Sequence, residues 1–295
     1  MKNFNFSVSI NLNFPNKTLE MLLKFLPYFR GCWLLYAPIF SFISDKDRLI
    51  ELLVSSHSKI IFKALFDPSD PYQLNMVKNK CFDLGTAMTI WSLLKPDDIF
   101  FDIGANCGYL SDIGSQKIGI DGRVIAIEPN PLAFKILTMR GVENITAINK
   151  VASQNSKGAF RMHRPFYRQT SGSRFLEDSH GKIKSVSLDD LYKESRKSRV
   201  ALIKIDTEGA ELFVLKGAEQ ILKEQHPFVI AEVSNYSKHF GYKMDDIYDY
   251  MKLFGYRYFY SIHDDTNSIS FLEKQEEGQV LFSYKQLEDV DFQKN

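Results

Sequence analysis

The sequence places an acidic side chain and two glycines at the end of an apolar run, a combination that could bind a nucleoside. The stretch DIGANCG, from Asp102 to Gly108, begins inside the apolar run IFFDI. Its glycines leave the backbone bare, so that a ligand can approach it. A helix that starts here presents free N–H groups and a partial positive charge, which suit a carboxylate or a phosphate.

The next apolar run, RVIAIEPNP from Arg123 to Pro131, ends with Glu128. An acid at the end of this second strand can accept hydrogen bonds from the two ribose hydroxyls of a nucleoside. The turn GANCG lacks the middle glycine of the dinucleotide pattern, and no P-loop G-K-[ST] is present. S-Adenosylmethionine fits better, with its amino-acid part near Asp102 and its ribose at Glu128. A dinucleotide-dependent oxidoreductase stays open as an alternative.

A second stretch, LIKIDTEGAE from Leu202 to Glu211, has a lysine inside an apolar run and three acids after it. One interpretation is structural. Asp206 or Thr207 would cap a helix, and the acids of its first turn, Glu208 and Glu211, would complement the helix dipole.

The other interpretation of this stretch is catalytic. Lys204, Asp206 and Glu208 would face the ligand, and Glu232 of the run VIAEV would join them from the neighbouring strand. Methyl transfer to a hydroxyl needs in-line approach and removal of a proton, so we expect Asp206 or Glu232 as the base and Lys204 as its orienting partner. His239 and His263 are alternative bases, and each is also explained as a surface or loop residue. These carboxylates are also explained without a divalent cation, and we predict no metal site.

From residue 97 onward, apolar runs alternate with helical patterns, which predicts a parallel sheet with helices on both faces. The fold class is α/β, doubly wound and Rossmann-like. Strands are expected at 99–103, 123–128, 142–149, 200–206, 228–233, 255–260 and 279–284, and helices at 107–118, 131–140, 210–224 and 244–254.

Residues 1–94 are predicted to form a helical N-terminal extension, and residues 95–295 the Rossmann-like domain. Within the extension, helical spacing of apolar residues is found at 19–29, at 46–66 and, in amphipathic form, at 81–94. The apolar segment 31–43 is shorter than the roughly 20 residues of a spanning helix, so we expect a buried segment rather than a membrane contact.

The stretch 156–187 is polar and aromatic, and we interpret it as a substrate loop or lid with a short strand at 158–163. Aromatic rings can stack on sugars, and guanidinium groups can hold a carboxylate or phosphate, so an anionic acceptor is one hypothesis. A solvated loop with a few anchoring aromatic residues is the other. The residues concerned are Arg161, His163, Arg164, Phe166, Tyr167, Arg168, Arg174 and Phe175.

Composition sets broad limits on function. The chain has 295 residues, 44% hydrophobic and 25% charged, which are ordinary globular values. A net charge of +1 disfavours a nucleic-acid partner, because no global basic field attracts a polyanion. Three scattered cysteines indicate neither disulfides nor a zinc site, and no secretory signal is recognisable, so we expect a cytoplasmic protein.

Together these stretches resemble the FkbM family of S-adenosylmethionine-dependent methyltransferases. The resemblance extends from about Lys95 to Tyr260 and implies a class I methyltransferase fold with a mostly parallel seven-stranded sheet. It also implies O-methylation of a hydroxyl, often on a sugar or polyketide-type product. It is carried by FFDIGANCGYLS from Phe100, VIAIEPNP from Val124, SLDD from Ser187, LIKIDTEGAELFVLKGA from Leu202 and VIAEV from Val229.

We therefore predict an S-adenosylmethionine-dependent O-methyltransferase that acts on a hydroxyl of a sugar, glycan or related small molecule. A nucleoside-binding relative without transferase activity remains an alternative. Cys107 departs mildly from the family pattern. The expected cofactor-binding residues are Asp102, Gly104, Ala105, Asn106, Gly108, Glu128, Asn130, Ala152 and Asp206; the expected catalytic residues are Asp206, Glu232, Lys204 and Glu208, with Glu211 matching the same motif.

Overall fold

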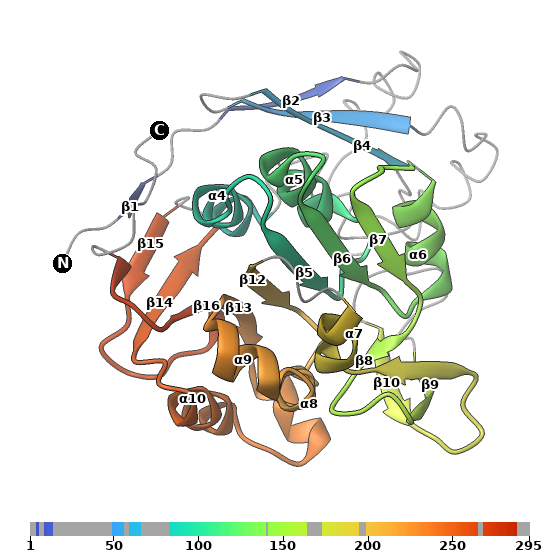
Figure 1. Ribbon diagram of the computed structural model, residues 1–295, viewed down its shortest axis with the longest axis vertical. Coiled ribbons are helices and arrows are strands. Elements are labelled where there is room, and N and C mark those ends of the chain that lie inside the picture. The colour runs from blue at the N-terminus through green and yellow to red at the C-terminus, as the bar shows by residue number, and fades with distance from the viewer. Residues whose placement is uncertain are drawn as a thin grey trace, which may run out of the picture.

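The computed structural model describes residues 83–139, 141–163, 173–194, 199–264 and 268–287, together with strands at 4–5, 9–13, 49–55 and 59–65. Figure 1 shows a central twisted sheet with helices packed on both of its faces. A three-stranded sheet, β2–β3–β4, lies outside α4 and α5, and a small sheet that contains β8, β9 and β10 lies below α6 and β7. The architecture is α/β, as the sequence predicts.

In the described part of the chain, nine strands form the central sheet in the order β1–β15–β14–β16–β13–β12–β5–β6–β7. The strands from β13 to β7 in this order run parallel, whereas β16 is antiparallel to both of its neighbours. The chain reverses direction across the sheet between β5 and β12, and open α/β sheets bind ligands at such a reversal. The strands are β1 (Phe4–Asn5), β5 (Ile99–Ile103), β6 (Arg123–Ile127), β7 (Ile145–Ile148), β12 (Val200–Ile205), β13 (Phe228–Val233), β14 (Tyr258–His263), β15 (Ser268–Phe271) and β16 (Gly278–Ser283).

The helices cover the two faces of the central sheet and enclose two apolar cores. Helices α4, α5 and α6 pack on one face, and α7, α8, α9 and α10 on the other. Side chains alternate along each strand, so that in β5 Phe100 faces the first group of helices and Phe101 the second. The helices are α4 (Leu84–Leu93), α5 (Tyr109–Ile118), α6 (Pro131–Thr138), α7 (Leu188–Glu194), α8 (Glu211–Lys216), α9 (Glu219–Gln225) and α10 (Met244–Leu253), with the 3₁₀ helix η2 (Asn235–Phe240).

The N-terminal region departs from the sequence prediction. The prediction of a helix at 46–66 is wrong, because β3 (Leu49–Ser55) and β4 (Lys59–Leu65) form an antiparallel hairpin there. Strand β2 (Ser9–Asn13) pairs with β3 and extends the hairpin to three strands. Short apolar runs fit both the helical and the strand period. In this case the stretches LIELLVS and KIIFKAL pair with each other as strands. Segments 19–29 and 31–43 lie outside the described residues, and the division at 94/95 stays a prediction.

Two helix predictions are corrected in detail. Helix α4 is not amphipathic, since each of its residues is buried. The helix expected at 210–224 is divided into α8 and α9 at Gly217, where an added Cβ would overlap the carbonyl of Ser153. The described sheet also has more strands than the expected seven, with β1 and β15 added at one edge.

The described part of the stretch 156–187 contains three strands, β9 (Ala159–His163), β10 (Arg174–Glu177) and β11 (Ile183–Val186). With β8 (Val151–Ala152), which precedes the stretch, they form a small sheet in the order β10–β9–β11–β8. The strand expected at 158–163 is therefore confirmed, while β10 and β11 were not predicted. Residues 164–172 lie outside the described chain. No helix among the described residues is long and apolar enough to cross a membrane.

Gly114 of α5 gives a test of how closely this helix packs on the sheet. An Ala at this position would normally stabilise a helix by roughly 0.5–1 kcal/mol. Its Cβ would overlap the ring of Phe100, which is fully buried and has no room to move. We expect Gly114→Ala to lower the free energy of unfolding in urea by about 1–3 kcal/mol. Gln116→Ala, on the exposed side of α5, should change it by less than about 0.5 kcal/mol. A more stable Gly114→Ala protein would contradict this packing.

Candidate active site

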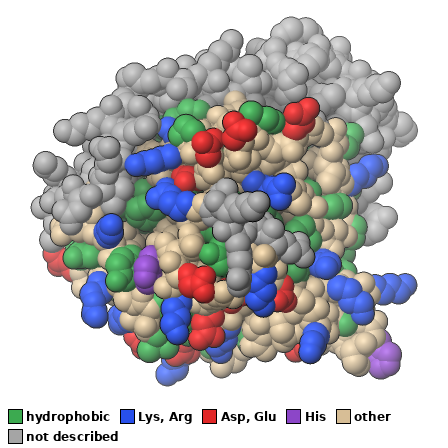
Figure 2. All heavy atoms as spheres, in the orientation of Figure 1, with side chains coloured by type: hydrophobic (Ala, Val, Ile, Leu, Met, Phe, Trp, Pro, Cys, Tyr) green, Lys and Arg blue, Asp and Glu red, His purple; other side chains and the backbone are tan. Residues whose placement is uncertain are grey.

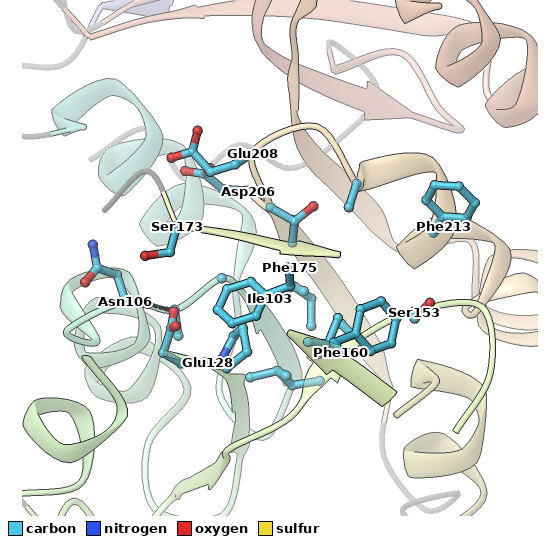
Figure 3. Close-up of a pocket in the computed structure, with 18 of the residues that line it drawn as sticks. Ile103, Asn106, Glu128, Ser153, Phe160, Ser173, Phe175, Asp206, Glu208 and Phe213 are labelled. Atoms are coloured by element: carbon cyan, nitrogen blue, oxygen red, sulfur yellow. Dashed lines mark hydrogen bonds between the residues drawn. The ribbon is translucent and has the colours of Figure 1, made fainter. Parts of the chain in front are cut away.

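A cavity of about 240 Å³ opens where β5, β6 and β12 end. Figure 3 shows Asn106 and Glu128 on one side of it, Asp206 and Glu208 on another, and the ring of Phe175 between Glu128 and the pair Asp206 and Glu208. The cavity thus lies where the chain reverses direction across the sheet, between β5 and β12. Of the expected cofactor residues, those that line it are Asp102, Gly104, Ala105, Asn106, Glu128, Ala152 and Asp206; of the expected catalytic residues, Lys204, Asp206 and Glu208.

The floor of the cavity is organised by Lys204. In the register of the sheet Lys204 lies directly beside Asp102, and alternation places both on the α5 face. Its Nζ lies 3.8 Å from Asp102 Oδ1 and 3.5 Å from Asp206 Oδ2, and donates a hydrogen bond to the Gly104 carbonyl at 3.3 Å. The ammonium group therefore connects the ends of β5 and β12.

Asp102 and Lys204 are both almost completely buried. Burial raises the pKa of Asp102, and the Lys204 ammonium together with the Ser111 hydroxyl, which donates to Asp102 Oδ2 at 2.5 Å, offset this only in part. Burial alone would lower the pKa of Lys204, but Asp206 and Asp102 outweigh it and the pKa is raised. Lys204 therefore carries its charge at neutral pH.

The glycine turn after β5 serves the protein's own packing before any ligand. Gly104 has φ +72°, and a Cβ there would overlap the carbonyl oxygen of Asp206. Asn106 follows with φ 50°, and Gly108 with φ 85° precedes the first residue of α5. We predicted that these glycines clear a path for a ligand. At Gly104 the missing side chain first allows the turns after β5 and β12 to touch.

Glu128 joins the turns after β5 and β6. Its carboxylate accepts hydrogen bonds from the backbone N–H groups of Asn106 at 2.8 Å and Asn130 at 2.6 Å. Burial raises its pKa to about 7, although these two hydrogen bonds act in the opposite direction. Asn130 accepts from the N–H of Leu132 and so caps α6, and its amide also donates to Ser173 Oγ at 3.4 Å. Asn130 does not itself line the cavity.

Glu211 lies in the first turn of α8, as the structural interpretation of its motif predicts. The predicted cap is wrong, because the N-cap residue of α8 is Ala210 and neither Asp206 nor Thr207. Glu211 is fully buried, and its Oε1 accepts hydrogen bonds from the Thr207 N–H, the Thr207 hydroxyl and the Gly209 N–H at 3.0–3.1 Å. The Tyr242 hydroxyl donates to the Gly209 carbonyl at 2.6 Å. This network holds the turn in which Glu208 has φ 56°, and so fixes the direction in which Glu208 enters the cavity.

Glu232 lies at the end of β13 beside the acidic turn but does not line the cavity. Burial, and then the charges of Asp206 and Glu208, raise its pKa to about 9. It is therefore protonated at neutral pH, which does not favour it as a general base. Its catalytic role stays a prediction, and Asp206, with a side chain 27% exposed, is the better placed carboxylate.

Aromatic residues form the wall opposite the acidic floor. Phe160 and Phe175 come from the small sheet, and Phe213 and Phe240 from α8 and η2. The rings of Phe213 and Phe240 meet edge to face with centroids 6.3 Å apart. The sequence identified only Phe175 as a candidate. Phe160 occupies an alternating position of the strand at 158–163, a signal that the polar context obscured.

The basic residues expected to contact the acceptor are only partly described. Arg161 pairs with Asp178 at 2.8 Å, and the Arg174 guanidinium lies 5.2 Å from the ring centroid of Tyr236. His163 is exposed on the strand beside Arg174. Positions Arg164, Phe166, Tyr167 and Arg168 lie outside the described residues. Within the described ranges, no group of three or more His, Cys, Asp or Glu side chains is arranged to hold a metal ion.

Comparison with known proteins relates this site to methyltransferases. Residues 102–258 match the family model described as the methyltransferase FkbM domain. The hexuronic acid methyltransferase AglP of Haloferax volcanii is 31% identical over 140 residues, which are 46% of this chain and 56% of that protein. The chain thus spans little more than half of the length of this curated relative.

Two solved structures align with the chain at low similarity. A methyltransferase FkbM from Methylobacillus flagellatus KT aligns with a TM-score of 0.42 and 20% identity, over 72% of this chain and 55% of that one. Fibrillarin from Aeropyrum pernix, in complex with natively bound S-adenosyl-L-methionine, aligns with a TM-score of 0.41 and 13% identity. This alignment covers 80% of this chain and 94% of that one. The family model, which spans more than half of the chain, is the finding that carries the assignment.

Lys204→Met tests the ion pair beneath the cavity. The substitution keeps the length of the side chain but leaves the Asp102 carboxylate buried without its cation. We expect the free energy of unfolding at pH 8 to fall by about 3–5 kcal/mol, and by less at pH 5, where Asp102 is more readily protonated. The double variant Lys204→Met/Asp102→Asn removes both charges and should recover much of this loss. If both variants were equally unstable, the pair would not be the cause.

Glu232→Gln tests the protonation of the acidic turn. The folded pKa of Glu232 is about 9, against an ordinary value of 4.5, so the wild-type protein loses stability as pH rises through this window. Gln cannot ionise. We expect Glu232→Gln to match the wild type near pH 5 and to exceed its free energy of unfolding by about 1–3 kcal/mol at pH 8.5. The free energies are measured by urea unfolding. A difference between the two proteins that does not change with pH would refute the raised pKa of Glu232.

Proposed function

The chain belongs to the FkbM methyltransferase family, and from this premise we propose that it transfers a methyl group from S-adenosylmethionine to a hydroxyl group of a sugar or glycan. It is a methyltransferase with a Rossmann-like class I fold. The observation that carries the proposal is the placement of Asp102 and Glu128 on one cavity at the ends of neighbouring strands. A carboxylate from each of two turns can hold the two polar ends of a nucleoside.

The residues around the cavity fit this cofactor. In the described chain, the buried oxygens Asp102 Oδ1 and Asn106 Oδ1 have no hydrogen-bond partner, and both residues line the cavity. A carboxylate oxygen and an amide oxygen suit the ammonium group of an amino acid. The nearby helix N-terminus suits its carboxylate. Buried acceptors without partners are costly, so a donor that satisfies them gains affinity.

Glu128 has the capacity to bind a ribose. A carboxylate offers about four lone-pair directions, and the two backbone N–H groups use two of them. The others remain for the two ribose hydroxyls. Ala152 and Ser153, at the end of β8, form an adjoining part of the wall where a purine ring can lie.

The charge of the cavity favours a cation. Among the described lining residues Lys204 is the single base, against the acids Asp83, Asp102, Glu128, Glu177, Asp206 and Glu208. S-Adenosylmethionine supplies a methyl group on a positively charged sulfur, so acidic surroundings stabilise its bound form. The negative field also disfavours NAD, whose pyrophosphate is an anion.

The chain's own residues can orient an acceptor hydroxyl and receive its proton. Asp206 reaches into the cavity from the end of β12, and the Lys204 ammonium at 3.5 Å holds its carboxylate in place. We assign Asp206 the role of base and Glu208 that of a hydrogen-bond acceptor for the acceptor molecule. The wall formed by Phe160 and Phe213 can pack on the apolar face of a sugar ring. A sugar acceptor is also consistent with the relative that is named for hexuronic acid.

The proposal is tested by calorimetry with S-adenosylhomocysteine and, in parallel, with NAD. We expect the wild type to bind the nucleoside and not NAD, and Glu128→Gln to weaken binding about tenfold. Because the pKa of Glu128 is about 7, affinity should rise between pH 6 and pH 8 as the carboxylate ionises, and Glu128→Gln should lose this rise. Glu143→Gln, at an exposed position before β7, is the matched control.

Binding of NAD but not of S-adenosylhomocysteine would refute the cofactor. Transfer is measured separately, from S-adenosylmethionine labelled at the methyl group to methyl glycosides of neutral and acidic hexoses. Label in the glycoside, lost in Asp206→Asn, is the expected result. Tight binding of the nucleoside with no transfer to any hydroxyl compound would support the alternative of a binding protein without transferase activity.

A further inference from the structure

Arg174 is a cation beside residues that line the cavity, and no carboxylate of the described residues pairs with it. It is the first residue of β10, and its guanidinium lies 5.2 Å from the ring centroid of Tyr236. In the part of the chain that the structure describes, this side chain makes no salt bridge. Arg161 lies on the neighbouring strand β9 and differs in this respect. It forms an ion pair with Asp178, in which Arg161 Nη2 lies 2.8 Å from Asp178 Oδ2.

The contact between Arg174 and Tyr236 joins two walls of the cavity. On one side, Ser173 and Phe175, the neighbours of Arg174 in sequence, both line it. On the other side, Tyr236 belongs to η2, which contributes Phe240 to the lining. A Cβ added to Gly209 would lie 2.8 Å from the Tyr236 backbone, so η2 rests against the acidic turn. The pair therefore stands where the small sheet approaches η2, at the mouth rather than on the floor.

A cation–π contact positions the guanidinium without consuming its hydrogen-bonding groups. A centroid distance of 5.2 Å is within the range of about 6 Å for this interaction. The N–H groups of an Arg held in this way remain free to bind a carboxylate or phosphate in bidentate fashion. The Tyr236 ring also stacks on His239, with ring centroids 6.4 Å apart. The residue is nevertheless 45% exposed, so a second molecule can contact it.

The acidic floor restricts where an anionic group of an acceptor can go. Lys204 is already engaged with Asp102, Asp206 and the Gly104 carbonyl. An acceptor anion would therefore be repelled from the floor and stabilised only at the mouth. An acceptor whose reacting hydroxyl and anionic group lie on opposite sides of its ring can place the hydroxyl near the acidic floor and the anionic group near Arg174.

We propose that Arg174 and Tyr236 form a subsite for a sugar ring that carries an anionic substituent, a carboxylate or a phosphate, away from the hydroxyl that is methylated. The inference rests on the proposed function and specifies its acceptor. Arg174 binds the anion, the Tyr236 ring packs on the sugar, and the hydroxyl on the far side of the ring points toward Asp206.

The test measures binding of three probes to protein saturated with S-adenosylhomocysteine, by saturation-transfer NMR titration. The probes are methyl β-D-glucuronide, glucose 6-phosphate and, as the neutral control, methyl β-D-glucoside. We expect at least one anionic probe to bind about three- to tenfold more tightly than the glucoside. The two anionic probes distinguish a carboxylate subsite from a phosphate subsite.

Variants of Arg174 and Tyr236 test whether these two side chains cause the preference for an anionic probe. Arg174→Gln should abolish the preference for the anionic probe. Arg123→Gln should retain it, because it removes the same charge from an exposed position at the start of β6, at the other end of this strand from the cavity. Tyr236→Ala should weaken all three probes, and Tyr236→Phe should change them little. In each variant the dissociation constant of S-adenosylhomocysteine should stay within about twofold of the wild type, because neither side chain reaches the cofactor end.

Equal binding of the glucoside and both anionic probes, or a preference that survives in Arg174→Gln, would overturn the subsite and leave the proposed function standing. Failure of all three probes to bind would also overturn it. Failure of S-adenosylhomocysteine itself to bind would refute the proposed function, and is observed before any probe is added.

Discussion

The interaction on which the site depends is the contact of one buried lysine with two carboxylates at the ends of adjacent parallel strands. Lys204 lies beside Asp102 in the register of β5 and β12, and reaches forward to Asp206 at the strand end. Without the ammonium, two acids would lie near each other, and one of them, Asp102, is completely buried. Like charges in such surroundings are strongly unfavourable. The lysine thus makes it possible to concentrate negative charge where the proposed sulfonium cofactor binds.

The remaining parts of the site are held by carboxylates that bind the protein's own backbone. Glu128 connects the turns after β5 and β6, and Glu211 closes the turn after β12 on itself. These acids therefore fix the positions of three turns before any ligand arrives. A pocket whose turns are already fixed loses less conformational entropy on binding. The same motif residues can in this way be structural and functional at once, and the two interpretations of the sequence do not exclude each other.

The sequence predicted the parts of the fold that follow from local pattern. The strands ending at Ile103, Glu128 and Asp206 are found within one residue of their expected ends, because apolar runs bounded by glycine and proline are unambiguous. The hairpin at 49–65 was mistaken for a helix, since its two short apolar runs fit both periods. The break at Gly217 was missed because its cause, contact with Ser153, lies more than sixty residues away in the chain.

The same distinction applies to the site. Asp102, Lys204 and Asp206 could be placed together from sequence, because the ends of parallel strands meet at one edge of the sheet. The absence of Glu232 from the cavity lining could not, since it depends on how the side chains around the end of β13 pack in the complete fold. The aromatic wall could not be predicted from the sequence either, because Phe160 and Phe213 come from elements whose proximity depends on the whole fold. The cofactor end is therefore built from contiguous motifs, whereas the acceptor end is assembled from the small sheet, α8 and η2. Acceptor choice can accordingly change by substitution in those elements while the motifs of the cofactor end stay intact.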